Sequence, residues 1–159
     1  MLVSKLLDDI GREILKILQE DGRISFNELG RKVGLSSPAV AERVRRMEEA
    51  GIILGYRAVV DQAQVGYPIM AYIRLSIPVS FLDQADALAK SIPEVLECHH
   101  LTGSDGVILK VIVSSVGHLE EVISKMGSCG MTTTAIVLSS PVTSRPIDPV
   151  RQQGPGQNQ

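Results

Sequence analysis

GLSSPAVAERVRRMEEAG, residues 34–51, is the stretch that decides the fold of the first third of the chain. Either Ser36 or Ser37 can cap a helix, because a serine hydroxyl accepts a bond from a backbone N–H that the first turn leaves unpaired, and Pro38 fits that same turn. The spacing predicts a helix that ends just before Gly51, since glycine readily takes the left-handed conformation of helix ends.

The predicted helix has two different faces. At about 100° per residue, Val40, Val44 and Met47 fall on one stripe. Small and charged residues lie towards the opposite side, namely Ala39, Glu42, Arg45 and Arg46. We therefore expect one face to pack against the rest of the domain and the other to be available for recognition.

A shorter helix is expected directly before this one. RISFNELGRKV, residues 23–33, has apolar residues at helical spacing, and Ser25 with Glu28 three residues later is a capping-box pattern. The two helices are joined through Gly34 and Leu35. Two short helices in this order, the second opening with small residues and carrying arginines, are typical of a helix-turn-helix that places its second helix in the major groove of DNA.

The flanking segments complete a first domain. Residues 8–21 have apolar residues at helical spacing, which predicts a helix that packs on the other two. IILGYRAVVD, residues 52–61, alternates and is rich in β-branched residues, which predicts a short extended wing. We therefore expect a winged helix-turn-helix at residues 1–60. A linker at 61–68 follows, where a glycine and a proline interrupt the pattern.

The second half of the chain changes period. Residues 69–77, IMAYIRLSI, alternate strictly, as a half-buried strand does. The segments that follow are a helix at 80–91, strands at 95–101 and 107–113, a helix at 119–127 and a strand at 132–138. The buried stripe of the first helix is expected to be Phe81, Leu82, Ala85, Leu88 and Ala89. The order β-α-β-β-α-β predicts an α+β fold, with a ferredoxin-like domain at 69–141 whose two helices cover one face of a four-stranded antiparallel sheet.

The other face of that sheet has no cover of its own. Met70, Tyr72 and their counterparts on neighbouring strands would be left in water. We therefore expect two copies to pair sheet to sheet as a homodimer. Residues 142–159 lose periodicity and gain proline, glycine and glutamine, so a largely disordered tail is expected there.

Composition limits the classes of function. Of the 159 residues, 44% are hydrophobic and 21% charged, as in soluble globular proteins. No signal peptide or long apolar span is recognisable, so a cytoplasmic protein without membrane contact is expected. Aromatic residues are only 3%, which disfavours recognition of nucleic acid by base stacking. The net charge of −2 is also unlike a strongly basic binder, so the DNA interpretation depends on the helix-turn-helix.

Metal, disulfide and cofactor chemistry have little support. Cys98 and Cys129 lack any paired spacing, so neither a zinc site nor a disulfide framework is indicated. His99 and His100 are adjacent on a predicted strand and point to opposite faces, so they cannot easily share one ion. The same alternation separates Cys98 from His99, which disfavours a nucleophile and base pair. No metal and no cofactor are expected.

In this order and spacing, the motifs resemble those of the Lrp/AsnC family of transcription regulators, also called feast/famine regulators. The likeness extends to about residue 140 and rests on LDDIGREILKILQEDGRIS, the GLS…V…R…RRMEEAGII run, the exit GYRAVVD, and PEVLECHHLTGSD…LKV. The resemblance implies a sequence-specific regulator, not an enzyme, that binds double-stranded DNA. It also implies an amino acid or related small metabolite as effector, and dimers that assemble into a higher oligomer such as an octamer.

DNA contact is expected from the second helix of the helix-turn-helix and from the wing. The candidate residues are Ser36, Ser37, Pro38, Ala39, Glu42, Arg43, Arg45, Arg46 and Arg57. Arg43 lies closer to the packing stripe, so a structural role is equally open for it. Arg45 has an alternative as well, because it can pair with Glu49 across one helical turn on a solvated face.

The resemblance further implies an effector pocket between dimers, formed by the loop after the second strand of the sensing domain and by the last strand. The residues at those positions are Thr102, Gly103, Ser104, Asp105, Gly106, Val107, Thr132 and Thr134. The loop departs from the Gly-acidic-Tyr-Asp pattern of many members, since Gly106 stands where the aspartate is expected and Asp105 sits one place earlier. A plain β-turn is the alternative interpretation of this loop.

Two other functions stay open. Tetrapyrrole decarboxylases resemble these regulators in their two-domain plan and would require histidine or arginine near the sheet, for which Arg74, His99 and His100 are the nearby candidates. The second alternative is an architectural protein that binds DNA generally and has no effector.

Overall fold

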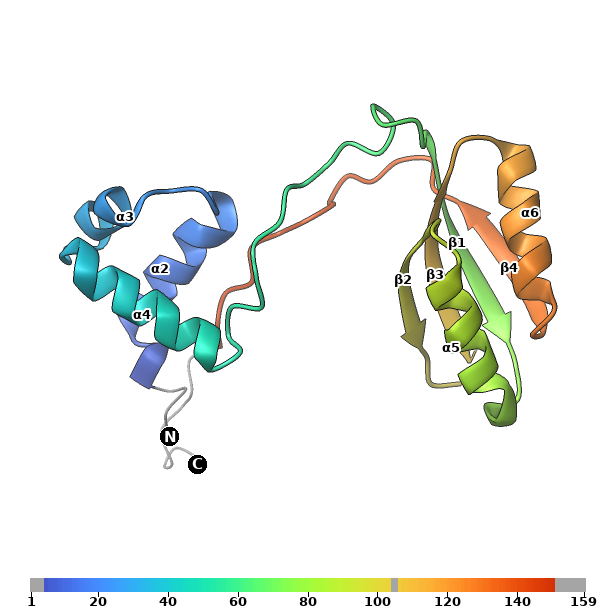
Figure 1. Ribbon diagram of the computed structural model, residues 1–159, viewed down its shortest axis with the longest axis horizontal. Coiled ribbons are helices and arrows are strands. Elements are labelled where there is room, and N and C mark those ends of the chain that lie inside the picture. The colour runs from blue at the N-terminus through green and yellow to red at the C-terminus, as the bar shows by residue number, and fades with distance from the viewer. Residues whose placement is uncertain (1–4, 104–105, 151–159) are drawn as a thin grey trace, which may run out of the picture. The chain divides into compact units, whose positions relative to one another are not determined.

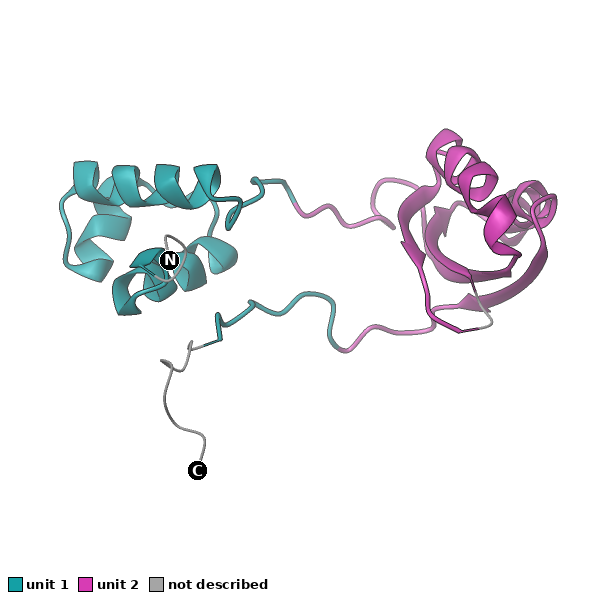
Figure 2. Cartoon of the chain, turned by 90° about the horizontal axis from the view of Figure 1, so that it is seen from below, with its two compact units in different colours: residues 1–58, 142–159 teal, residues 59–141 magenta. Residues whose placement is uncertain are grey.

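The computed structural model describes residues 5–103 and 106–150 and divides into two units, residues 1–58 with 142–159 and residues 59–141 (Figure 2). Each unit has its own hydrophobic cluster, and the two clusters share no residue. No helix in the described parts of the chain combines the length and the apolar character needed to cross a bilayer.

Three helices of the first unit have bounds within the described residues: α2 (Asp9–Glu20), α3 (Phe26–Val33) and α4 (Ser37–Glu49) (Figure 1). Asp8, Ser25 and Ser36 each accept a hydrogen bond from the backbone N–H three residues later, at 2.8, 3.2 and 3.4 Å. Of the two serines predicted as caps of α4, Ser36 is the one used. Gly34 and Gly51 follow α3 and α4 with φ of 71° and 68°, the left-handed conformation that suits glycine.

The core of this unit comes from one stripe of each helix. Ile14 of α2, Leu29 of α3 and Val40 of α4 are completely buried. Val44 and Met47 continue the stripe of α4 on the same buried face. The predicted helix-turn-helix is therefore confirmed, together with the assignment of the packing face of α4.

The segment predicted as a wing is different. Within the described chain, residues 52–60 form no strand. Leu54 and Val59 are almost fully exposed. The segment is tied to α4 by the N–H groups of Ile52 and Ile53, which donate to the Met47 carbonyl at 2.9 and 3.2 Å, and by the Tyr56 hydroxyl, which donates to Glu48 Oε1 at 3.1 Å. The alternating pattern misleads because an extended segment is stabilised only when another strand pairs with its backbone groups. The wing is not seen in this chain.

The second unit has the predicted ferredoxin-like order. Its strands are β1 (Ile69–Ser76), β2 (Val95–His100), β3 (Val107–Val113) and β4 (Met131–Ile136). They pair antiparallel in the order β2-β3-β1-β4. Its helices are η1 (Val79–Phe81), α5 (Leu82–Ser91) and α6 (Val116–Gly127). Helices α5 and α6 lie on the same side of the sheet (Figures 1 and 2).

Strand β1 alternates as predicted. Ala71, Ile73 and Leu75 are completely buried beneath the helices, whereas Tyr72 is 38% exposed on the opposite face. One predicted core residue is wrong, because Phe81 is 42% exposed. It falls in the 3-10 turn that precedes α5, where helical spacing no longer aims its side chain at the sheet.

The last described residues contact the first unit. Residues 142–150 form neither helix nor strand, but they hydrogen-bond to α2 within the first unit. The Ile147 N–H donates to Gln19 Oε1 at 2.7 Å, and Gln19 Nε2 donates back to the Ile147 carbonyl at 3.1 Å. Arg12 Nη1 donates to the Pro149 carbonyl at 2.7 Å. The remainder of the predicted tail, 151–159, lies outside the described residues.

Candidate functional site

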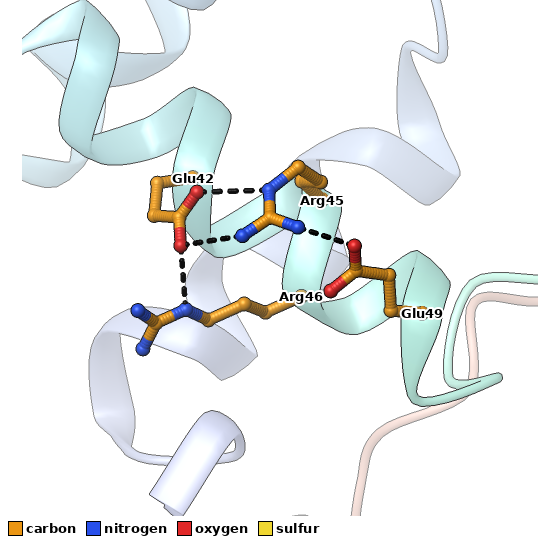
Figure 3. A network of polar contacts seen from close by, with 4 residues as sticks. All are labelled: Glu42, Arg45, Arg46 and Glu49. Carbon is orange, nitrogen blue, oxygen red and sulfur yellow. Dashed lines mark hydrogen bonds and ion pairs between the residues drawn. The ribbon is translucent and has the colours of Figure 1, made fainter.

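The exposed face of α4 carries a connected network of four charged side chains (Figure 3). Arg45 donates from Nε and Nη2 to the two carboxylate oxygens of Glu42, at 2.9 and 2.8 Å, and from Nη1 to Glu49. Arg46 donates from Nε to the same carboxylate of Glu42, at 2.7 Å. These pairs are three or four residues apart, the separations at which side chains meet on a helix surface.

The network is charged yet neutral in sum. Hydrogen bonds from Arg45, the larger cause, and from Arg46 lower the pKa of Glu42 to about 2. Glu42 likewise raises the pKa of Arg45. All four side chains are between 42% and 61% exposed, so their ion pairs add little to stability. The face therefore presents two cations and two anions to solvent, joined by hydrogen bonds.

Arg43 has a different role from its neighbours. Its Nη1 and Nη2 donate to the two carboxylate oxygens of Asp8, at 2.8 and 2.9 Å. Asp8 is also the cap of α2, so this bidentate pair fastens α4 to the beginning of α2. The Arg43 guanidinium lowers the pKa of Asp8. Of the two roles that the sequence left open for Arg43, these contacts favour the structural one.

The other residues predicted to contact DNA lie at the two ends of α4. The hydroxyl of Ser36 is occupied by its capping bond, and Ser37 and Pro38 form the first turn beside it. Ala39 is half-buried, and Arg57 is exposed in the segment beyond the helix. DNA contact by these residues stays a prediction.

The described residues among those predicted for the effector pocket lie towards one end of the sheet. Leu75 of β1 pairs with Val107 of β3 on one side and with Thr132 of β4 on the other. Thr102 and Gly103, in the loop that leads into β3, are therefore at the same end as Thr132. Topology thus brings together two segments that are distant in the sequence.

These positions differ in what they can offer a ligand. Val107 is completely buried, so its side chain belongs to the core. Thr132 and Thr134 are half-buried on the edge strand β4. Gly106 is half-buried at the start of β3, and Ser104 and Asp105 lie outside the described residues. Thr102 and Gly103 are exposed, so among these positions they have the most access to solvent.

The face of the sheet opposite the helices is partly apolar. Ile108 and Ile112 of β3 are half-buried there, although no described element of the second unit covers that face. Lys110 lies between them and donates to Glu97 Oε1 of β2 at 2.9 Å. Among the described residues of the second unit, this face therefore stays open to solvent.

The two histidines separate as predicted. His99 Nε2 lies 3.3 Å from Glu97 Oε2 on the open face, whereas His100 Nε2 lies 2.8 Å from Asp86 Oδ1 of α5. Within the described residues, no cluster of three or more His, Cys, Asp or Glu side chains could hold a metal ion. Cys98 is exposed as a residue, but partial desolvation of its thiol and the nearby negative charge of Asp86 raise the pKa of that thiol. The higher pKa disfavours the reactive thiolate. Arg74 is on β1, where it pairs with Ile108 and Thr133.

Sequence reasoning missed a hollow of about 540 Å³ between α5 and β2. Asp86, Lys90, Cys98 and His100 are among the residues that line it. No pattern in the sequence could have indicated it, because its two walls come from a helix face and a strand edge that meet only after folding. By contrast, the network on α4 was visible as charges at helical spacing.

Comparison with known proteins matches each of the two units to a known domain family. Residues 7–48 match the AsnC-type helix-turn-helix domain, and residues 70–147 match the Lrp/AsnC ligand binding domain. The uncharacterized HTH-type transcriptional regulator YezC of Bacillus subtilis is 42% identical over 134 residues, which are 84% of this chain and 95% of the relative. Such relatives are named transcription regulators, which points away from an enzyme.

Solved structures give the same answer. LrpC of B. subtilis matches with a TM-score of 0.82 and 32% identity, over 87% of this chain and 99% of that one. The feast or famine regulatory protein Rv3291c of M. tuberculosis, solved in complex with L-methionine, matches with a TM-score of 0.83 and 33% identity, over 90% of this chain and 99% of that one. Since both domains match in order, the chain belongs to the Lrp/AsnC family of DNA-binding transcription regulators.

Proposed function

We propose that this regulator acts in the cytoplasm as a homo-oligomer that recognises a pseudo-palindromic DNA site, and that an amino acid changes its occupancy of that site. The observation that carries the proposal is the division of α4 into two faces. Its apolar stripe is fully buried, while the face with Arg45 and Arg46 is open to solvent. A rigid helix with one exposed polar face is what the major groove accepts.

The open face of the sheet supports the dimer. Ile108, Ile112 and Tyr72 form a partly apolar surface flanked by the Lys110–Glu97 pair. Two copies related by a twofold axis would bury this surface against itself. Each dimer would then present two α4 helices, which explains why a pseudo-palindromic site is expected. Dimers assembled into a ring such as an octamer are part of the same proposal.

The effector proposal rests on one end of the sheet, where Thr132 and the loop near Gly103 lie. The structure of the related Rv3291c contains L-methionine, so an α-amino acid is the ligand class to test first. A hydroxyl and backbone groups could bind its carboxylate and ammonium. The effector would act by binding one assembly state more tightly than another, which shifts the population bound to DNA.

The test is to map the DNA bound in cells with and without an added amino-acid mixture, followed by titration of a recovered duplex in vitro. Specific sites whose occupancy changes with the mixture are the expected result. The affinity in vitro should fall steeply with salt, because phosphate contacts release counterions. Thr132→Val, which replaces the hydroxyl with a methyl group, should weaken the response to L-methionine without weakening DNA binding. Affinity that is independent of salt, or binding without site preference, would contradict the proposal.

A further inference from the structure

The two exposed arginines of α4, Arg45 and Arg46, differ in how many of their nitrogens donate a hydrogen bond. Arg45 donates from all three of its nitrogens, two to Glu42 and one to Glu49. Arg46 donates only from Nε, again to Glu42. Its Nη1 and Nη2 make no hydrogen bond to the residues that the structure describes. Figure 3 shows that outer end of Arg46 pointing away from the carboxylates.

We propose that Glu42 is a positioning residue that aims the guanidinium of Arg46 at the duplex and withholds Arg45 from it. Arg46 would then be the arginine of this pair that contacts DNA. The inference deepens the proposed function and rests on it. It also separates two residues that the sequence treats as equivalent candidates.

The geometry of a guanidinium is the reason for the assignment. A bond from Nε to a carboxylate fixes the plane of the group and leaves the Nη1 and Nη2 edge facing outward. That edge is a rigid pair of donors that matches two phosphate oxygens, or the O6 and N7 of guanine. Arg46 therefore presents a preoriented fork to the groove, with its side chain 61% exposed.

Arg45 would meet a penalty that Arg46 avoids. To reach DNA it would have to give up three charge-assisted hydrogen bonds. The released carboxylates of Glu42 and Glu49 would then lie close to phosphates of the same charge. In contrast, Arg46 can add contacts through its outer edge and keep its bond to Glu42.

Glu42 also weakens the electrostatic attraction of α4 to DNA phosphates, which is the same for every base sequence. Two carboxylates offset two guanidinium groups on this face, so long-range attraction to phosphate is weak. Because the arginines lower the pKa of Glu42 to about 2, the arrangement persists at every pH at which binding is normally studied. Preference for a particular site would then come from the orientation of Arg46 rather than from net charge.

The first experiment compares two variants of equal charge. The wild-type protein is used to enrich a duplex from a randomised library, and affinities for the enriched duplex and for the unselected library are measured by fluorescence anisotropy. Arg46→Gln should weaken binding to the enriched duplex by roughly 10-fold to 100-fold, the usual range for a lost bidentate contact. Arg45→Gln removes the same charge and should weaken both duplexes by a similar, smaller factor.

The second experiment compares two variants that remove a carboxylate. Glu42→Gln and Glu49→Gln each remove one negative charge from α4, so both should strengthen binding to the unselected library. Only Glu42→Gln should reduce the preference for the enriched duplex, by about tenfold, because only Glu42 holds Arg46 and a neutral amide oxygen accepts a weaker hydrogen bond from its Nε than a carboxylate does. Circular dichroism checks that helix content is unchanged in all four variants.

Two results would overturn the inference alone. One is an equal loss of affinity in Arg45→Gln and Arg46→Gln, and the other is an unchanged preference in Glu42→Gln, while the wild-type protein still enriches a sequence. If the wild-type protein enriches no sequence at all, the proposed function fails and the inference fails with it.

Discussion

The two units build their candidate sites in opposite ways. On α4, residues three and four positions apart meet on one face of a single helix, so the arrangement is local. At the end of the sheet, Val107, Leu75 and Thr132 come from three strands and form one row only because β1 lies between β3 and β4. A site on one helix is therefore fixed by spacing in the sequence, whereas a site across strands is fixed by topology.

The largest expected effect breaks one unit and leaves the other folded. Leu29 is completely buried in the cluster of α2, α3 and α4, which shares no residue with the cluster of the second unit. Leu29→Ala should lower the free energy of unfolding of the first unit by about 2–5 kcal/mol, the usual loss for a core leucine. Hydrogen exchange should show reduced protection in the three helices and unchanged protection in β1 and β3.

The matched variant reverses this pattern. Leu109 is completely buried in the cluster of the second unit. Leu109→Ala should therefore destabilise the sheet by a similar amount and spare the three helices. If either substitution lowered protection equally in both units, the units would not be independent in stability.

The next effect concerns the open face of the sheet, which is the proposed contact between copies. Ile112 lies on the open face of β3, opposite Met70 of β1. Ile112→Glu would place a carboxylate inside the proposed dimer contact, where desolvation of an unpaired charge costs several kcal/mol. We expect the dimer to dissociate about 100-fold more readily, which corresponds to ~2.7 kcal/mol. Analytical ultracentrifugation over a range of concentrations measures this change.

Val79→Glu provides the control. Val79 is 82% exposed and lies in η1, outside the sheet, so the same added charge should leave the oligomer unchanged. Equal dissociation constants for Ile112→Glu and the wild-type protein would show that this face is not the contact between copies.

The successful and the failed predictions from sequence divide in the same way, into features set by local spacing and features set by contacts between distant segments. The caps at Ser25 and Ser36 and the strand alternation of β1 are local patterns, and all of them are present. The burial of Phe81 failed because the helical spacing does not extend back into the 3-10 turn, and the wing failed because an extended segment needs a partner strand that short-range periodicity does not reveal. The attachment of Ile147 to Gln19 was invisible for the same reason, since it joins opposite ends of the chain.

The candidate site shows this contrast within one helix. The Arg45–Glu49 pair was foreseen from its spacing of four residues, and the same rule applied to Glu42 would have found its bonds to Arg45 and Arg46. The Arg43–Asp8 pair could not be found in this way, because the two residues are 35 positions apart. Three neighbouring arginines thus have three different environments.

A smaller effect isolates the Arg43–Asp8 pair. Asp8→Ala removes both the cap of α2 and the ion pair, and a lost cap typically costs about 1 kcal/mol of stability. Asp8→Asn keeps a good cap and removes only the ion pair. Asp8→Asn should therefore be closer to the wild-type protein than Asp8→Ala in the free energy of unfolding measured with urea.

The pair also predicts a dependence on pH. Arg43 lowers the pKa of Asp8 in the folded protein, so the unfolded chain binds the proton more readily. The stabilisation is fully present above the unfolded pKa of about 3.9 and is lost as the pH falls through the lower, folded value. The difference in stability between the wild-type protein and Asp8→Asn should therefore shrink below about pH 4. A difference that stays constant down to pH ~2 would show that the pair adds no stability.

The smallest effect tests whether the bond between Gln19 and Ile147 holds residues 142–150 on α2. Gln19 uses its amide to bond both the N–H and the carbonyl of Ile147. Gln19→Ala should lower the protection of the Ile147 amide against hydrogen exchange by roughly fivefold, since a partly exposed hydrogen bond contributes about 1 kcal/mol. Lys16→Ala, at an exposed position on the same helix, should leave that amide unchanged. If both substitutions had the same effect, general loss of helix stability would explain it, and the bond to Gln19 would not be what holds residues 142–150 on α2.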